Sequence, residues 1–411
     1  MQLIGPFAQI LPLTGLPEKG PVSDDALQVI ENGGALIADD GAVAFGSYAQ
    51  LRKEHPAAVL QLTDEPQVLM PGFIDAHTHI CFAGNRSRDY AMRIAGRSYL
   101  DIARAGGGIW DSVTKTREAT VTELAENTVA RANRHLQSGV TTIEVKSGYG
   151  LNAEDELKML RAIRTAGLHT KATLISTCLA AHMRPKDFDG HEKAYLQWVL
   201  HELLPLVKAE QLAERIDIFI EETAFSPEAA QPFLEQAGMK ITVHADQFSS
   251  GGSKTAVETD ALSADHLEAS TEEDIRRLAA SRTVAVVLPG ASLGLGMHYA
   301  PARKLLDAGA CLAIASDWNP GSAPMGELLM QAAVMSAAEK LSTAEVLAGL
   351  TFRAAKALGI ALPAGDLQAY PCKDYRDVLY YQGSMKPAAV WKGGEQVMMD
   401  GSAGSVFRAP C

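Results

Sequence analysis

Eight short runs of apolar and β-branched residues alternate with helical segments along most of this chain. Helical patterns fill the gaps between the runs, for example at 122–137, 153–166 and 226–237. The first run, at 68–70, leads into the segment before residue 77, and the others lie at 141–145, 172–177, 216–220, 240–243, 261–264, 283–288 and 311–315. Eight strand–helix units in one region predict an α/β fold built as a (β/α)8 TIM-type barrel.

A doubly wound open sheet is the main alternative for such an alternating pattern. That fold usually carries a Gly-x-Gly-x-x-Gly turn after an early strand, and no early run in this sequence is followed by one. We therefore predict a barrel that occupies residues 71–364.

The two chain ends carry a different, purely β pattern. Residues 35–38 and 42–46 flank an Asp-Asp-Gly turn, which is typical of a hairpin. Near the other end, apolar runs at 378–381 and 388–391 precede a Gly-Gly turn. Because chain termini often lie close together, we expect residues 1–70 and 365–411 to form one small discontinuous β-sandwich domain without catalytic groups.

Charge and composition narrow the partners. A formal net charge of −12 is unfavourable for binding nucleic acid, which requires a basic face. No apolar run approaches the roughly 18 residues of a membrane span, so no membrane partner is expected. The five cysteines at 81, 178, 311, 372 and 411 are scattered and odd in number, which favours reduced thiols in the cytoplasm.

Several histidines fall at the ends of the predicted strands. His77 and His79 are two residues apart, so they project from the same side of an extended segment. His244 ends the fifth strand and Asp317 closes the eighth. Barrel enzymes place their chemistry at this carboxyl-terminal rim. A lone His-x-His pair is equally consistent with solvated side chains, but together these four residues predict an N3O set for one divalent cation.

Two further histidines lie at the same rim: His182 after the third strand and His266 at the end of the sixth. The remaining histidines fall in predicted helices or loops, where solvated or capping roles are expected. His298 is a candidate exception because it lies in a glycine-rich loop after the seventh strand.

Five local stretches resemble the amidohydrolase superfamily and, within it, the imidazolonepropionases. The resemblance covers roughly residues 68–358 and weakens after Gly359. The stretches are His77-Thr78-His79 through Gly84-Asn85-Arg86, Ser98-Tyr99-Leu100 with Gly106-Gly107-Gly108-Ile109, Glu144-Val145-Lys146-Ser147-Gly148-Tyr149-Gly150, His244-Ala245-Asp246-Gln247, and Asp317-Trp318-Asn319-Pro320-Gly321. The resemblance implies metal-dependent hydrolysis of the cyclic amide of 4-imidazolone-5-propanoate to N-formimino-L-glutamate, a step of histidine degradation.

The resemblance also bears on the number of metal ions. Many members of the superfamily hold two metals bridged by a carboxylated lysine on the fourth strand. This chain has no lysine there, and Lys146 is on the second strand, where it is expected to pair with a carboxylate. We therefore expect one divalent ion per chain, Zn²⁺ or Fe²⁺, bound by His77, His79, His244 and Asp317.

Substrate roles follow from the matched stretches. Arg86 lies in the first rim loop and is expected to bind the propionate carboxylate with two parallel hydrogen bonds, although a salt bridge with Asp89 is the simpler alternative. His182 is expected to bind the ring carbonyl oxygen or a developing oxyanion. The glycines at 106–108 could close over the ligand. Further ring or carboxylate contacts are expected from Tyr99, Tyr149 and Asn319.

Ring opening also needs a proton carrier. His266 and Asp317 are the candidates, because an imidazole near neutrality can accept and then donate a proton. Some relatives carry a glutamate where this chain has Gln247, and an amide can orient water but cannot take a proton. The predicted catalytic residues are therefore His266, Asp317, His182 and Gln247.

Other functions fit part of this pattern. A deaminase of an aromatic amine, or a different cyclic amidase, would use the same metal ligands without needing Arg86. A non-catalytic binding protein would leave the metal set unexplained. The resemblance implies a small anionic substrate and a homodimer.

Overall fold

The barrel is present in the computed structural model, which describes residues 1–63, 65–97 and 99–399. Eight parallel strands of this described part form one sheet in the order β6 to β13, each paired with its sequence neighbour. The strands are β6 Phe73–Asp75, β7 Val140–Lys146, β8 Thr173–Ala181, β9 Arg215–Phe219, β10 Lys240–Ala245, β11 Ser263–His266, β12 Val284–Val287 and β13 Leu312–Ile314. Each of these strands except β6 overlaps one of the predicted runs.

The sheet closes just beyond β6 and β13. Thr78 and Trp318 form an isolated parallel bridge. The Asp317 amide donates to the His77 carbonyl at 3.1 Å, and the His79 amide donates to the Trp318 carbonyl at 2.9 Å. Closure of the barrel therefore places the His-x-His segment directly beside Asp317.

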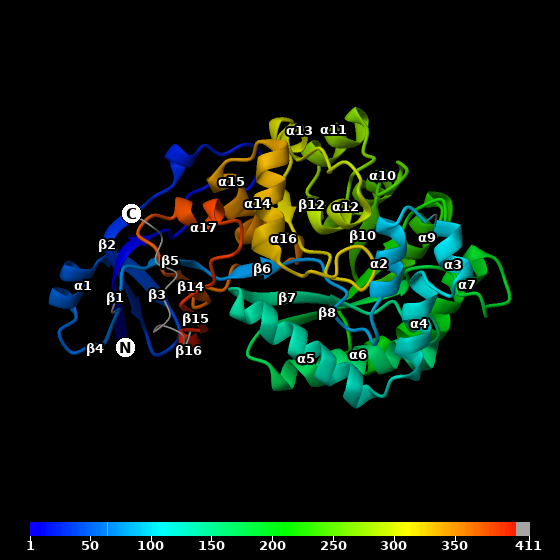
Figure 1. The fold of residues 1–411 in the computed structure, drawn as a ribbon, viewed down its shortest axis with the longest axis horizontal. Coiled ribbons are helices and arrows are strands. Elements are labelled where there is room, and N and C mark those ends of the chain that lie inside the picture. Colours follow the sequence, from blue (N-terminus) through cyan, green and yellow to red (C-terminus); the bar gives the residue numbers. More distant parts are fainter. Residues whose placement is uncertain (64, 98, 400–411) are drawn as a thin grey trace.

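Helices surround the barrel (Figure 1). Those that follow the strands are α5 Val121–Gln137, α6 Ala153–His169, α7 Glu192–Trp198, α8 Leu204–Ala209, α9 Pro227–Ala237, α10 Gly252–Glu258, α11 Glu272–Ala280, α12 Pro289–Leu295, α13 Ala302–Asp307, α14 Leu328–Glu339, α15 Thr343–Leu350 and α16 Phe352–Ala357. Three more, α2 Ser87–Ile94, α3 Tyr99–Arg104 and α4 Ile109–Glu118, lie in the long excursion between β6 and β7. That excursion contributes the first rim loop.

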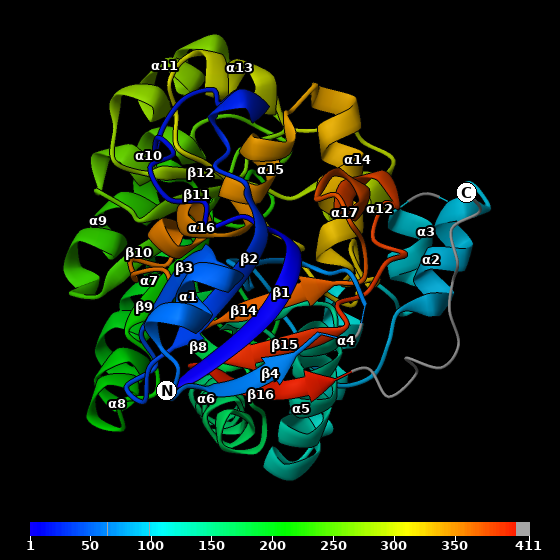
Figure 2. The same ribbon diagram turned by 90° about the vertical axis from the view of Figure 1, so that its left-hand side faces the viewer.

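The chain ends form a second, mixed sheet beside the barrel (Figure 2). Strand β14 from the carboxyl-terminal part pairs antiparallel with β5, so the two ends are joined by backbone hydrogen bonds. The strands of this mixed sheet are β1 Gln2–Ile10, β2 Ile30–Ile37, β3 Val43–Ser47, β4 Val59–Leu62, β5 Val68–Pro71, β14 Leu367–Tyr370, β15 Ala389–Lys392 and β16 Glu395–Met399. The predicted fold class is confirmed. Where a sandwich was expected, the described strands share one continuous sheet. The domain boundaries stay a prediction.

Two local predictions were wrong. The run 68–70 belongs to β5 of the mixed sheet and not to the first barrel strand, because the barrel begins only at Phe73. The chain crosses at Gly72, where a Cβ would lie 2.6 Å from the Thr141 side chain. The run 378–381 was expected to be a strand but falls largely in a helix, α17 Arg376–Tyr380, in which Val378 is buried and Tyr380 exposed. Local β propensity yields there to packing on one helical face.

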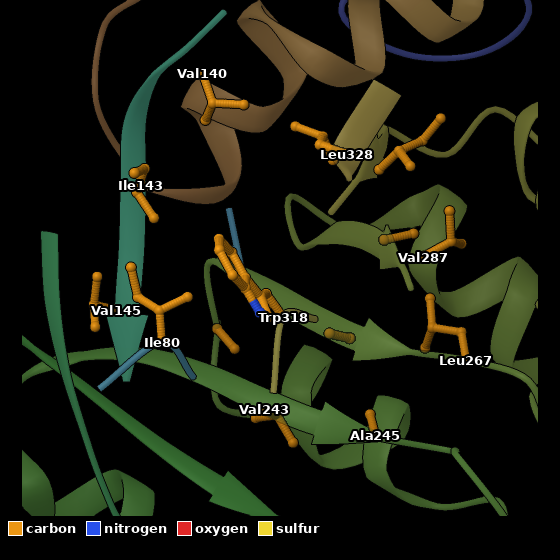
Figure 3. Close-up of a cluster of buried hydrophobic side chains, with 14 of the residues drawn as sticks. Ile80, Val140, Ile143, Val145, Val243, Ala245, Leu267, Val287, Trp318 and Leu328 are labelled. Atoms are coloured by element: carbon orange, nitrogen blue, oxygen red, sulfur yellow. The ribbon is translucent and has the colours of Figure 1, made fainter. Parts of the chain in front are cut away.

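Buried apolar side chains pack around the barrel strands. Trp318 lies among side chains from several barrel strands, including Ile143, Val243 and Val287 (Figure 3). Cysteines 81, 178, 311 and 372 are buried and free, as predicted, whereas Cys411 lies outside the described residues. Among the helices that the structure describes, none is both long enough and apolar enough to cross a membrane.

Candidate metal centre and active site

Four predicted metal ligands converge at the carboxyl-terminal end of the barrel. His77 and His79 follow β6, His244 lies in β10, and Asp317 follows β13. The Nε2 atom of His79 lies 3.3 Å from that of His77 and 3.2 Å from that of His244. Asp317 Oδ1 lies 3.6 Å from His77 Nε2 and 3.4 Å from His79 Nε2. We call these four side chains the donor cluster.

The spacing of the donor cluster fits one divalent cation. Four ligand atoms arranged tetrahedrally about 2.1 Å from an ion lie about 3.4 Å from one another, and the four distances given above, 3.2–3.6 Å, agree with that value. Without a cation, the lone pairs of neighbouring ring nitrogens would face each other in a buried space. Three imidazole nitrogens and one carboxylate oxygen form a donor set that suits Zn²⁺ or Fe²⁺.

The protonation of the cluster also suits a cation. Burial, reinforced by neighbouring histidines and Lys146, holds the pKa of His77 and His79 well below the usual histidine value. Burial lowers the pKa of His244 to about 4, although Asp217 opposes the shift. These imidazoles are therefore neutral near pH 7, with free lone pairs. Burial raises the pKa of Asp317 to about 6, and a nearby cation would favour its ionised form.

Backbone strain is concentrated at the same rim. Asp246, His266, Leu267 and Asp317 all have positive φ angles, of 53°, 92°, 74° and 50°. Such angles are uncommon for residues with side chains and persist where the surrounding structure holds them. They redirect the chain at the ends of β10, β11 and β13, where the predicted site residues lie.

Two buried carboxylates orient the histidine ligands. Asp265 Oδ2 lies 2.6 Å from His77 Nδ1, and Asp217 Oδ1 lies 3.1 Å from His244 Nδ1. A carboxylate behind a ligating histidine fixes its tautomer and ring orientation, so that Nε2 carries the lone pair. Neither aspartate was identified from the sequence. Their positions within β9 and β11 were a usable signal, because an acidic residue inside an apolar strand requires a buried partner.

His266 lies beside the donor cluster but has a different environment. One of its ring nitrogens lies within 4.8 Å of ligand atoms of His77 and His244. Burial alone would lower the pKa of His266. The negative charges of Glu268, whose Oε2 lies 3.7 Å from Nδ1, and of Asp317 outweigh the effect of burial, so the pKa of His266 is raised. Glu268 is the residue that sequence reasoning missed here. It makes His266 more basic than the surrounding histidines.

His182 and Tyr149 form a wall next to His79. The His182 ring stacks on the His79 ring at a centroid distance of 5.3 Å. The centroid of the Tyr149 ring lies 5.5 Å from that of His182. His182 Nδ1 lies 3.0 Å from the Gly148 carbonyl oxygen, so Nδ1 donates a hydrogen bond there. Gly148 has φ of 108°, and a Cβ on it would lie 3.1 Å from His182 Nδ1. Both predicted residues are thus brought to the site.

Comparisons with known proteins identify the family to which the chain belongs. Residues 68–369 match the amidohydrolase family. An imidazolonepropionase from Fusobacterium nucleatum subsp. nucleatum is 38% identical over 387 residues, covering 91% of this chain and 93% of that relative. Another from Acinetobacter baumannii is 42% identical over 341 residues, covering 80% and 85%.

This chain belongs to the imidazolonepropionases of the amidohydrolase family. Among solved structures, an atrazine chlorohydrolase from Arthrobacter aurescens TC1 complexed with zinc is similar, with a TM-score of 0.68 and 16% identity over 97% of this chain and 95% of that one. An adenosine deaminase from Xanthomonas campestris with bound zinc has a TM-score of 0.65 and 16% identity over 97% and 93%. At this identity, both similarities establish the fold alone.

The enzyme's first rim loop carries Arg86, whose side chain is 14% exposed. Its Nε donates to Asp89 Oδ2 at 2.8 Å, so the alternative salt bridge is present. Asp89 Oδ2 also accepts the Gly108 amide at 2.8 Å, which ties the glycine loop to Arg86. A Cβ on Gly321 would lie 2.4 Å from Arg86 Nη1, so this guanidinium faces the loop after β13.

The other predicted residues of the enzyme differ in their environments. Gln247 is buried three residues beyond His244. The amide of Asn319 donates to the Asp317 carbonyl and Ser322 Oγ, and its oxygen accepts the amides of residues 321 and 322. Asn319 therefore uses its amide groups to build its own loop. Tyr99 opens helix α3, but its side chain lies outside the described residues.

The histidines away from the rim follow the expectation with one exception. His191 caps α7, where its side chain accepts the Ala194 amide. His298 Nε2 lies 2.9 Å from the Glu268 carbonyl oxygen. His135 was expected to be solvated or capping, but it is buried, 3.1 Å from Asp75 and packed against Trp318. Its helix α5 presents it to the barrel, and periodicity alone did not distinguish that face.

Proposed function

We propose that the enzyme hydrolyses the ring amide of 4-imidazolone-5-propanoate to N-formimino-L-glutamate. The observation that carries this proposal is the combination of the donor cluster, whose four side chains are linked by distances of 3.2–3.6 Å, with 38% identity to an imidazolonepropionase over 91% of the chain. Neither alone is as specific, because the donor set and fold also occur in hydrolases of other substrates.

His77, His79, His244 and Asp317 would hold one divalent ion, Zn²⁺ or Fe²⁺. A bound divalent cation lowers the pKa of water and polarises a carbonyl oxygen. The residues around it then determine which bond is attacked. The single-ion stoichiometry is supported by β9, which ends without a lysine and whose Asp217 is already paired with His244 and Lys146.

Arg86 is assigned to the propionate carboxylate. Its Nε is held by Asp89, which leaves the two Nη groups to form paired hydrogen bonds with an anion. The missing side chain of Gly321 makes room for the guanidinium, since a Cβ there would lie 2.4 Å from Nη1. Tyr99, Tyr149 and Asn319 stay predictions for further contacts, with Asn319 acting by shaping the loop beside Arg86.

His266 is assigned to the proton. Water adds its oxygen to the ring carbonyl carbon and gives a proton to His266, and the bond from that carbon to the ring nitrogen then breaks. His266 returns the proton to the departing nitrogen, so that the products are a carboxyl group and an N–H. The carboxylate of Glu268 stabilises the protonated imidazole between the two steps. Gln247 can orient the water but cannot replace His266.

The tautomer of His182 changes the role that the sequence suggested for it. Because Nδ1–H donates to the Gly148 carbonyl, Nε2 of the neutral ring carries a lone pair and accepts hydrogen bonds. Burial lowers the pKa of His182 to about 3, so the ring does not gain a second proton near pH 7. We therefore assign His182 to a ring N–H of the substrate rather than to the carbonyl oxygen.

A substrate comparison tests the proposal. Purified metal-loaded enzyme is given imidazolone propionate and, separately, an aromatic amine, with N-formimino-L-glutamate and ammonia measured as products. Formation of N-formimino-L-glutamate without ammonia release from the amine is expected. Ammonia release from the amine alone would favour the deaminase function instead. The small anionic substrate, homodimer and cytoplasmic location stay predictions.

A further inference from the structure

A buried lysine lies below the donor cluster, surrounded by carboxylates. Lys146 Nζ is 2.9 Å from Glu144 Oε1, 2.7 Å from Asp217 Oδ2 and 3.9 Å from Asp265 Oδ2. All four side chains are at most 1% exposed. They come from β7, β9 and β11, and we call them the lysine network.

Each carboxylate of the lysine network reaches a segment that bears a proposed metal ligand. Asp265 bonds the His77 ring, and Asp217 bonds both the His244 ring and, at 3.3 Å, the His244 amide. Glu144 Oε2 accepts the amide of Thr78, the residue between His77 and His79, at 3.2 Å. The Lys146 amide donates in turn to the Thr78 carbonyl at 2.9 Å.

One ammonium group is thus the shared partner of three carboxylates that position three histidine ligands. Three carboxylates packed together in a space without water repel one another, and without the central ammonium each would be pushed away from the other two. A carboxylate that is displaced in this way no longer holds the histidine ring or backbone amide that it orients. Asp317, the remaining ligand, is held separately by Asn319 and Ser322.

We propose that Lys146 is a positioning residue for the metal centre, which fixes the orientation of His77, His79 and His244 through the carboxylates of Glu144, Asp217 and Asp265. Lys146 itself binds neither metal nor substrate. The proposal does not depend on which substrate the enzyme uses, because it concerns the affinity and geometry of the metal site.

Metal binding to three full-length variants tests the proposal. Lys146→Met removes the ammonium but keeps most of the side-chain volume. Lys146→Met combined with Glu144→Gln also removes one negative charge, while the glutamine oxygen can still accept the Thr78 amide. Lys146→Arg retains the positive charge. Lys392→Met is the matched control, because Lys392 pairs with the buried Asp366 in the mixed sheet.

Each protein is first stripped of metal. Its Zn²⁺ affinity is then measured by competition with a chromophoric chelator, and a second sample is loaded with Co²⁺ to record its visible spectrum. We expect both Met variants to bind Zn²⁺ about 10- to 100-fold more weakly, the usual effect of losing an outer partner of a metal ligand. Their Co²⁺ spectra should change shape. Lys146→Arg should recover part of the affinity, and Lys392→Met should match the wild type in both readouts.

Wild-type affinity and an unchanged Co²⁺ spectrum in either folded Met variant would overturn the proposal. Failure of all three Lys146 variants to fold, while Lys392→Met folds, would also overturn it, because Lys146 would then support the barrel rather than the ligands. Weaker Zn²⁺ binding together with a changed Co²⁺ spectrum in the Met variants would support the proposal even if imidazolone propionate proved not to be the substrate.

Discussion

Replacing Arg86 by alanine should weaken the binding of the substrate carboxylate. The guanidinium is mostly buried, its Nε is occupied by Asp89, and its Nη1 side faces the loop after β13. Hydrogen bonds to a charged partner contribute about 1.5–3 kcal/mol, which corresponds to about 10- to 150-fold in binding. Because the Asp89 carboxylate offsets part of the positive charge, we expect a value toward the lower end.

The effect should appear in KM more than in kcat, because the carboxylate contact is made equally in the ground and transition states. The assay compares imidazolone propionate with an analogue lacking the carboxylate, using wild type, Arg86→Ala and Arg86→Lys. Wild type should strongly prefer the acid, Arg86→Ala should lose most of that preference, and Arg86→Lys should recover part of it. Arg88→Ala, which removes an exposed arginine in the first turn of the adjoining helix α2, is the control. Equal handling of both ligands by wild type and Arg86→Ala would refute the assignment.

Three further predictions concern the metal and the proton. His266→Ala should keep its metal, as measured by elemental analysis, but lower kcat by roughly 10²- to 10⁴-fold, and Gln247→Ala should do less; equal losses would mean that the base is wrongly assigned. Glu268→Gln should move the acid limb of the kcat/KM profile to lower pH, because Glu268 raises the pKa of His266 and the base form must be neutral to accept a proton; an unmoved limb would separate Glu268 from catalysis. His244→Ala should lose both metal and activity, whereas His182→Ala should retain metal, and metal loss from His182→Ala would place that residue among the ligands.

The sequence predicted the barrel because each strand after the first was marked by its own apolar run. It predicted the donor cluster because parallel strands of a barrel end at a shared rim, so residues far apart in sequence, such as His77 and Asp317, had to meet. Neither step required knowledge of side-chain packing.

The residues that lie behind the metal ligands and beside His266 were not predictable in the same way. Which carboxylate lies behind His77 depends on the registers of all the strand pairs between β6 and β11, and strand runs do not specify them. Likewise, the raised pKa of His266 depends on Glu268, which reaches it around a strained turn at Leu267. For Lys146, the sequence suggested a carboxylate partner but not that three of them would share it.

The most direct test of the account is turnover of imidazolone propionate by one preparation of the purified enzyme as isolated, after chelation and after refilling with Zn²⁺ or Fe²⁺, with bound metal measured at each stage. We expect about one metal equivalent per chain, formation of N-formimino-L-glutamate, loss of turnover with loss of metal, and recovery on refilling. Turnover that persists in the metal-free protein, or an enzyme that holds its metal but leaves imidazolone propionate unchanged, would contradict the account.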